Sequence, residues 1–384
     1  MDFPTYLEAQ LDSYLDDLRT LTGIDSGTKD RDGVERVNAW LEVRLKQLGF
    51  SIEREAQADV GDNLIGRLDG RGSGHILLIG HSDTVFPKGT AAARPMHIAG
   101  DRILGPGVCD MKSGLLTGLY AVQALQAQGF DSFGRITFLC VSDEEVEDRR
   151  SHPLLHRLSR EADVGLTLES ARANGDIVVA RKGVRVYVIE ARGRAAHAGV
   201  EPEKGRNAIV AMAEHTLALN ALNGYRPDVT VNPGVIEGGS ASNVVPEYAR
   251  LEVDVRGFTL DAIQDTAAAI AAQLERETVP GVEMAMTLVG HGHEPMPYTE
   301  QVSAVEALAK QAAQELGFEI DGAHTGGASD ASIVAAEGRP VLDGLGPVGG
   351  LDHSPDEYIL LSSIVPRTAL LAKLIVALAQ RHKE

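Results

Sequence analysis

The stretch Ile76-Leu77-Leu78-Ile79-Gly80-His81-Ser82-Asp83 decides how this chain of 384 residues is interpreted. It begins with a run of bulky apolar residues, which is typical of a buried strand. His81 and Asp83 follow at the end of that strand, where open α/β sheets place their ligands. A glycine-rich loop over residues 105–110 then supplies Asp110, and apolar residues at helical spacing come after it. The stretch therefore predicts a ligand-binding edge of a helix-covered sheet.

Strand-like and helix-like segments alternate around this stretch. The periodicity predicts helices over residues 5–21 and 34–48, and strands over residues 62–68, 75–79, 135–141 and 163–168. Alternation of this kind favours a mostly parallel sheet covered by helices, that is, an α/β fold.

Beyond Gly183 the pattern changes to half-exposed strands. The order of the segments over residues 184–289 is β-α-β-β-α-β, the signature of a ferredoxin-like α+β domain with a one-sided antiparallel sheet. The first pattern resumes after Pro297, with helices predicted over residues 302–316 and 361–379. We therefore predict a first domain formed by residues 1–182 and 293–384, interrupted by an inserted domain of residues 183–292.

Composition excludes several classes of protein. The formal net charge of −19 disfavours binding to nucleic acid and to anionic membranes. Two cysteines, Cys109 and Cys140, are too few for a disulfide-built fold and have no spacing of a cysteine-based zinc site. The N-terminal residues lack the features of a signal peptide, and no apolar run approaches the roughly 18 residues of a membrane span. We expect a cytoplasmic protein.

Residues that can bind metal or move protons gather at the ends of the predicted strands. They are His81, Asp83, Asp110, Glu144, Glu145, Glu169 and, near the C-terminus, His353. Zinc accepts histidine nitrogen and carboxylate oxygen, and two ions roughly 3.5–4 Å apart can share a hydroxide and polarise a carbonyl. Three carboxylates and a hydroxide would offset the four positive charges of such a pair of ions.

Each of these residues also has a structural interpretation. A single histidine after a strand is more often structural than a ligand, and residues 143–148 could form a solvated acidic loop. The combination of His81 with Asp83, and the buried strand that precedes Glu144 and Glu145, favours a metal centre.

The motifs, taken in order, resemble the M20 family of di-zinc metallopeptidases, and within it the bacterial glutamate carboxypeptidases. The matching segments are residues 80–85, 105–112, 143–145, Glu169, residues 196–199 and residues 352–354. The resemblance implies that Asp110 bridges two zinc ions, for which Co²⁺ or Mn²⁺ could substitute. His81 and Glu169 would complete the shell of one ion, and Glu145 and His353 that of the other.

The same resemblance implies roles for two further acids and a backbone feature. Asp83 would accept the ring N–H of His81 and so hold its tautomer. Glu144 would deprotonate the bridging water, giving the attacking hydroxide, and would later protonate the leaving amine. The peptide bond after Asp110 would be cis.

In the inserted domain, the resemblance implies a lid that also forms a homodimer. His197 would reach the partner subunit's site and polarise the scissile carbonyl. Asn243 and Arg256 would bind a substrate carboxylate, with backbone N–H groups of Gly326 and Gly327 near the same end of the substrate. Arg256 could instead pair with an acid of its own domain.

Two departures from the family pattern bear on the substrate side chain. The family usually continues after the paired glutamates with a small Gly-Ser turn, whereas this chain has Val146-Glu147-Asp148-Arg149-Arg150. The glutamate-specific members carry an arginine where this chain has His291-Gly292-His293.

The predicted function is that of a zinc-dependent metallocarboxypeptidase. It would release a C-terminal amino acid, with glutamate as the first expectation, from a peptide, N-acyl or folyl substrate that carries a free carboxylate. An N-acyl-amino-acid deacylase, or another aminoacylase or peptidase of the family, would use the same zinc centre. A non-catalytic dimeric binding protein would have lost a ligand or the base, and the sequence retains them all.

Overall fold

A computed structural model describes residues 2–146 and 149–381, which divide into two compact units. Unit 1 consists of Met1–Val179, Tyr298–His324 and Ser329–Glu384, and unit 2 of Ala180–Pro297 and Thr325–Ala328. The domain boundaries after residues 182 and 292 stay predictions.

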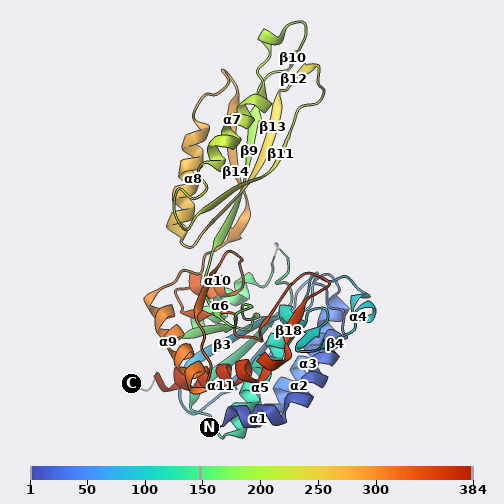
Figure 1. The fold of residues 1–384 in the computed structure, drawn as a ribbon, viewed down its shortest axis with the longest axis vertical. Helices are drawn as coiled ribbons and strands as arrows, with labels where there is room; N and C mark the ends of the chain where they lie inside the picture. Colours follow the sequence, from blue (N-terminus) through green and yellow to red (C-terminus); the bar gives the residue numbers. More distant parts are fainter. Residues whose placement is uncertain (1, 147–148, 382–384) are drawn as a thin grey trace. The chain divides into compact units, whose positions relative to one another are not determined.

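A six-stranded sheet forms the centre of unit 1, in the order β1-β2-β6-β3-β7-β16. Figure 1 shows its strand β3 among the helices of unit 1. The strands are β1 (Ser51–Glu55), β2 (Asn63–Asp69), β3 (Ser73–His81), β6 (Phe133–Val141), β7 (Val164–Thr167) and β16 (Val341–Leu342). Strands β6, β3, β7 and β16 run parallel, and β2 is antiparallel to β6. A parallel strand is buried on both faces, which explains why Ile76 to Ile79 are all apolar and at most 1% exposed. The mostly parallel sheet is confirmed.

Helices cover both faces of this sheet. Leu166 of β7 belongs to the same core as α5 (Ser113–Ala127) and α11 (Ile364–Arg381), whereas a Cβ at Gly165 would face Val334 of α10 (Ala331–Ala336). Because neighbouring residues of a strand point to opposite faces, α10 and its neighbour α6 (His152–Glu161) lie across the sheet from α5 and α11. The remaining helices of unit 1 with more than one turn are α1 (Phe3–Ala9), α2 (Leu11–Thr22), α3 (Arg31–Gln47) and α9 (Glu300–Glu315). The single helix expected over residues 5–21 is divided between α1 and α2, which meet at Gln10.

The C-terminal helix corrects one expectation. In the part of the chain that the structure describes, one segment, Leu361–Arg381, is long and apolar enough to cross a membrane by length and composition. From the sequence alone, we expect no apolar run of that length. Most of this segment is buried inside unit 1, and Leu370, Leu371 and Leu374 are fully inaccessible. The apolar side chains therefore pack in the core between α5 and α9.

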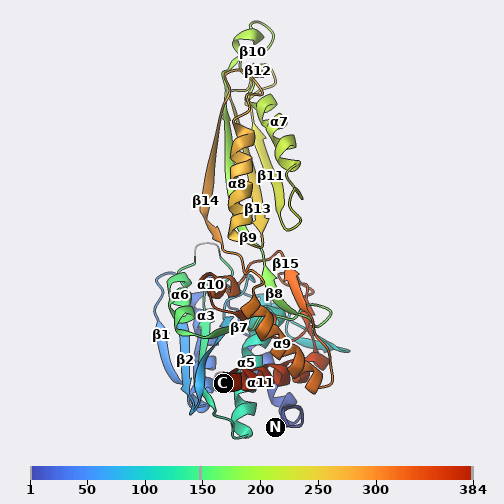
Figure 2. The same cartoon turned by 90° about the vertical axis from the view of Figure 1, so that its left-hand side faces the viewer.

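Unit 2 is built on a four-stranded antiparallel sheet in the order β11-β13-β9-β14. The strands are β9 (Gly183–Arg192), β11 (Thr230–Gly238), β13 (Tyr248–Gly257) and β14 (Glu283–His293). Helices α7 (Ala208–Asn220) and α8 (Leu260–Leu274) lie against one face of the sheet (Figure 2). The chain order is β-α-β-β-α-β, so the ferredoxin-like fold is confirmed. Ile189, Leu251 and Val253 point to the helices and are buried, as their alternation predicts.

A small second sheet in unit 1 joins segments that are far apart in the sequence. Strand β18 (Tyr358–Leu360) pairs with β17 (Gly349–Gly350) on one side and with β5 (Arg102–Leu104) on the other. The loop between β17 and β18 carries His353, and the loop after β5 leads to Asp110. This pairing therefore brings the C-terminal histidine to the glycine-rich loop.

Candidate metal centre

Parallel strands place the candidate ligands at one edge of the main sheet. Strand β3 ends at His81, and β6 ends at Val141 just before Glu144 and Glu145. Strand β7 ends shortly before Glu169. These three strands are neighbours and run in the same direction, so their carboxyl ends meet.

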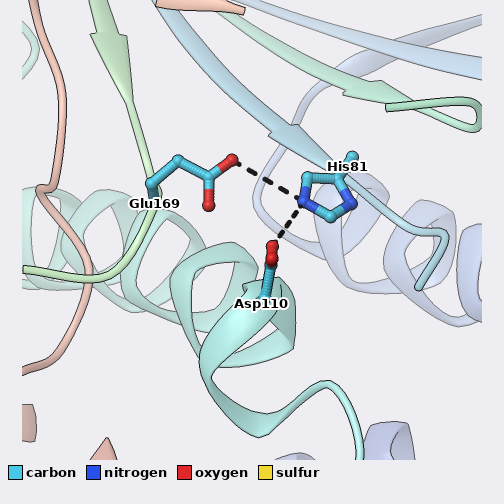
Figure 3. Close-up of side chains that lie close together, drawn as sticks. All are labelled: His81, Asp110 and Glu169. Atoms are coloured by element: carbon cyan, nitrogen blue, oxygen red, sulfur yellow. Dashed lines mark hydrogen bonds and ion pairs between the residues drawn. The ribbon is translucent and has the colours of Figure 1, made fainter. Parts of the chain in front are cut away.

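The first group of potential ligands consists of His81, Asp110 and Glu169 (Figure 3). His81 Nε2 lies 2.9 Å from Asp110 Oδ1 and 3.6 Å from Glu169 Oε1. The His81 side chain is 1% exposed. Burial opposes a charge on His81, but its hydrogen bonds to Asp110 and Asp83 outweigh that effect and raise its pKa.

The second group consists of Asp110, Glu145 and His353. His353 Nε2 lies 3.1 Å from Asp110 Oδ2 and 3.2 Å from Glu145 Oε2. The two groups therefore use different oxygens of Asp110. The His353 side chain is 54% exposed, so this side of the centre is open to solvent. Its hydrogen bond to Asp110 raises the pKa of His353 to about 9.

The donor set fits divalent metal ions. In each group the donor atoms all lie within 4.8 Å of one another, and each group contains one imidazole nitrogen and two carboxylates. This combination suits zinc and also other divalent ions such as Co²⁺ and Mn²⁺. Glu145 Oε1 is buried and has no hydrogen-bond partner among the described residues, so its lone pairs are available to a metal ion. Three protein ligands per ion leave positions for water and substrate.

Asp83 joins the histidine to the turn that carries the paired glutamates. Its buried carboxylate lies 3.3 Å from His81 Nδ1 through Oδ1. The backbone N–H groups of Glu144 and Glu145 donate to Oδ1 and Oδ2, and the Thr28 hydroxyl donates to Oδ2. His81 Nδ1 also lies 3.0 Å from the backbone carbonyl of Asp83, which is nearer than the carboxylate. The Asp83 side chain in addition holds the 144–145 turn, which its sequence position did not predict.

Glu144 has the surroundings of a group that exchanges a proton near neutral pH. Burial raises the pKa of the Glu144 carboxyl to about 8, and the guanidinium of Arg149, 3.7 Å away, works in the opposite direction. A carboxyl shifted upward in this way can accept and return a proton at physiological pH.

Glu357 supports the loop that carries Asp110, and the sequence did not predict this role. Its buried carboxylate accepts the backbone N–H groups of Gly107 at 3.0 Å, Cys109 at 2.8 Å and Asp110 at 3.0 Å. It thereby holds the loop that presents Asp110 to both ligand groups. The peptide bond between Asp110 and Met111 is cis, as the resemblance implies. No spacing rule links Glu357 to a loop some 250 positions earlier in the chain.

A cavity of about 550 Å³ is lined in part by the candidate ligand Glu145. Its lining includes the apolar side chains of Val85, Phe86 and Pro87, together with Lys29 and Lys88. All of its lining residues belong to unit 1.

In unit 2, the structure brings His197 and Asn243 together. Strand β10 (Ala196–His197) pairs with β12 (Val244–Val245), and the backbone N–H of Ala198 donates to the carbonyl of Asn243. Both His197 and Asn243 are exposed. The Gly199 N–H donates to His197 Nδ1 at 3.2 Å.

Arg256 lies near the other end of the sheet of unit 2. Its guanidinium binds both oxygens of Asp254, at 2.8 and 3.0 Å, and donates to the carbonyl of Gly326 at 2.9 Å. Arg181 donates similarly to the carbonyl of Gly327. About 25 Å of extended strand separates Tyr248, which follows the Asn243 turn, from Arg256. Asn243 and Arg256 are therefore not brought together within one chain.

The two departures from the family pattern are only partly covered by the structure. Strand β14 continues past the predicted end at residue 289 and includes His291 and His293. The carbonyl of His293 accepts a hydrogen bond from Arg185 at 2.7 Å. In the other departure, Glu147 and Asp148 lie outside the described residues.

Comparisons with known proteins agree with this geometry. Residues 77–377 match the model of peptidase family M20/M25/M40. Carboxypeptidase G2 of Pseudomonas sp. (strain RS-16) is 31% identical over 369 residues, covering 94% of this chain and 88% of that protein. Acetylornithine deacetylase of Proteus mirabilis (strain HI4320) is 28% identical over 375 residues, covering 90% and 89%. The crystal structure of aminopeptidase PepT from Bacillus cereus ATCC 10987 superposes with a TM-score of 0.83 at 25% identity, covering 96% of this chain and 99% of that one.

Proposed function

This chain belongs to peptidase family M20/M25/M40, a family of metal-dependent hydrolases, and we propose that it is a di-zinc carboxypeptidase. The reaction would be hydrolysis of the amide that joins a C-terminal amino acid to a peptide, N-acyl or folyl group. The observation that carries this proposal is the pair of donor groups that share Asp110, with Glu144 next to them in the chain.

Each ligand has a place in the proposal. His81, Asp110 and Glu169 would hold one ion, and Asp110, Glu145 and His353 the other. When bound, two divalent ions polarise a carbonyl and lower the pKa of water.

The protein's own groups would manage the proton and the substrate. Glu144 would take a proton from the attacking water and deliver it to the leaving amine, since its raised pKa suits both transfers. Asp83 would keep His81 in one tautomer. The acyl group of the substrate would enter the cavity beside Glu145.

We assign the recognition of the substrate carboxylate and oxyanion to unit 2. His197 and Asn243 would act on the site of a partner subunit, and Arg256, with Gly326 and Gly327, on the free carboxylate once Arg256 leaves Asp254. A homodimer through unit 2 is supported by large apolar side chains exposed on α7 and on the edge strand β11. They are Ile209, Val210, Leu217, Val235 and Ile236. Buried free cysteines, Cys109 and Cys140, agree with the cytoplasmic location that we propose.

The second candidate is an N-acyl-amino-acid deacylase. Acetylornithine deacetylase and succinyl-diaminopimelate desuccinylase are among the relatives, at 27–29% identity. The two candidates share the metal centre and differ in the lining of the substrate pocket. The histidines at 291 and 293, in place of an arginine typical of glutamate-specific members, favour this candidate over a strict preference for glutamate.

The test is a substrate panel with identification of the product. Zinc-loaded protein would be incubated with folyl, N-acyl and dipeptide derivatives of acidic, basic and apolar amino acids, and the released amino acid identified by mass spectrometry. We expect release of a C-terminal amino acid, with Glu144→Gln as the inactive control. Hydrolysis only of substrates without a free carboxylate, or of none at all, would refute the carboxypeptidase proposal.

A further inference from the structure

Arg149 is a buried arginine beside the proposed catalytic carboxylate. It lies in the segment that leads from β6 to α6, and its side chain is 2% exposed. The usual Gly-Ser turn of the family has no side chain that could take this place. Arg149 is therefore a feature of this chain's own departure from the family pattern.

The guanidinium of Arg149 lies between two acids of unit 1. Its Nη2 is 2.5 Å from Asp330 Oδ1, and its Nη1 is 3.7 Å from Glu144 Oε1. Asp330 is as deeply buried as Arg149 and immediately precedes α10. Nη2 also approaches the Ser151 hydroxyl at 3.5 Å.

The two distances indicate different roles for Asp330 and Glu144. A buried guanidinium is stable only when it is paired, and the short contact with Asp330 supplies that pairing. The rigid, planar fork of the arginine then directs its second edge toward Glu144. The backbone of Glu144 is held separately, because its N–H donates to Asp83 at 3.1 Å. The backbone of Glu144 is thus held by Asp83, and its carboxylate faces Arg149 at the distance of an ion pair.

The neighbouring Arg150 gives a natural comparison. Its side chain is 55% exposed and pairs with Asp59, itself 77% exposed, at 3.4 Å. Surface pairs of this kind contribute little. Two adjacent arginines therefore occupy opposite environments, and only Arg149 faces the site.

We propose that Arg149, anchored by Asp330, is a positioning residue that holds the Glu144 carboxylate in the orientation needed for proton transfer. The inference rests on the proposed role of Glu144 as the base. Arg149 itself contacts neither substrate nor metal ligand in this role; it acts through Glu144.

The test uses variants that separate positioning from folding. Arg149→Met alone leaves Asp330 as an unpaired buried charge, which threatens folding. The double variant Arg149→Met/Asp330→Asn removes both charges together. Arg149→Lys keeps the charge but loses the fork, and Arg150→Met is the matched control on the surface. For each, kcat, KM, metal content and melting temperature would be measured, and the metal-loaded double variant crystallised.

We expect the double variant to lose about 10–100-fold in kcat, as is typical when a second-layer partner is removed, with KM and metal content unchanged. Arg149→Lys should lose less kcat than the double variant, and Arg150→Met should have the kcat of the wild type. The crystal structure should show the Glu144 carboxylate in another rotamer than in the wild type.

The inference is overturned if the double variant turns over within twofold of the wild type, or if its loss of turnover follows a loss of metal. A wild-type protein that cleaves no amide would refute the proposed function instead. The crystallographic comparison would then still decide whether Arg149 positions Glu144.

Discussion

The candidate ligands in unit 1 and the candidate substrate groups in unit 2 are held in opposite ways. His81 and Asp83 are almost inaccessible and belong to a continuous network that includes Glu144 and Glu357. His197 and Asn243, by contrast, are exposed and are contacted mainly through the backbone. The candidate metal ligands therefore all lie within unit 1 and contact one another, whereas His197 and Asn243 lie on the exposed surface of unit 2.

The largest effect is expected where the network is densest. Glu144→Gln removes the base but preserves the shape of the side chain, so kcat should fall by about 10²–10⁴-fold while the metal content stays unchanged. Steady-state kinetics and metal analysis on the same sample check this. Near-normal turnover by fully metal-loaded Glu144→Gln would contradict the assignment of Glu144.

The next effect tests the exposed region. His197→Ala should lower kcat by about 10²–10³-fold, the range seen when one donor to an oxyanion is removed. Metal content should not change, because His197 belongs to neither ligand group.

The same variant shows in which subunit His197 acts. Mixing His197→Ala with Glu144→Gln should restore activity if the histidine serves its partner, because a heterodimer then has one intact site. Confirmed subunit exchange without any recovered activity would argue against a contribution across the dimer.

A smaller effect is expected at Glu357, which accepts hydrogen bonds from the backbone of the glycine-rich loop. Glu357→Gln replaces one of the two oxygens that accept backbone N–H groups with an NH2 group that cannot accept them, so activity or metal affinity should fall by about 10–100-fold. Asp356→Asn, at the exposed neighbouring position, is the matched control. Equal activity and metal affinity in the two variants would show that Glu357 does not support the Asp110 loop.

Metal binding should also depend on pH. The hydrogen bond to Asp110 raises the pKa of His353 to about 9, and a protonated imidazole cannot bind a metal ion. Metal affinity should therefore rise with pH up to about 9, by about tenfold per pH unit for each proton displaced, and then level off. Competition with a chelator between pH 6 and 9 measures this slope. An affinity independent of pH would mean that His353 binds neither proton nor metal.

The sequence predicts those parts that depend on periodicity or on strand ends. The apolar run at residues 76–79 identifies a central parallel strand, and the rule that parallel strands share one carboxyl edge predicts that His81, Glu145 and Glu169 lie close together. Their separate roles as metal ligands are implied by the resemblance alone. Alternation within unit 2 identifies the ferredoxin-like order of its elements.

The sequence alone does not predict contacts between segments that are far apart in the chain. Glu357 binds backbone groups of residues 107–110, and Arg149 meets Asp330, and neither contact leaves a periodic trace. For Arg256, the contact lies within one strand instead. A local partner two residues away, Asp254, occupies the guanidinium that the resemblance assigns to substrate.

The central claim is that Asp110 joins two metal sites in one chain, and metal content tests it most directly. Zinc-loaded, dialysed wild-type protein and Asp110→Ala would be analysed by inductively coupled plasma mass spectrometry. Because Asp110 is a member of both three-residue groups, its removal leaves two donors for each ion. We predict close to two zinc ions per wild-type chain and fewer than one in the variant. One ion or less per wild-type chain, or an unchanged content in Asp110→Ala, would contradict the account.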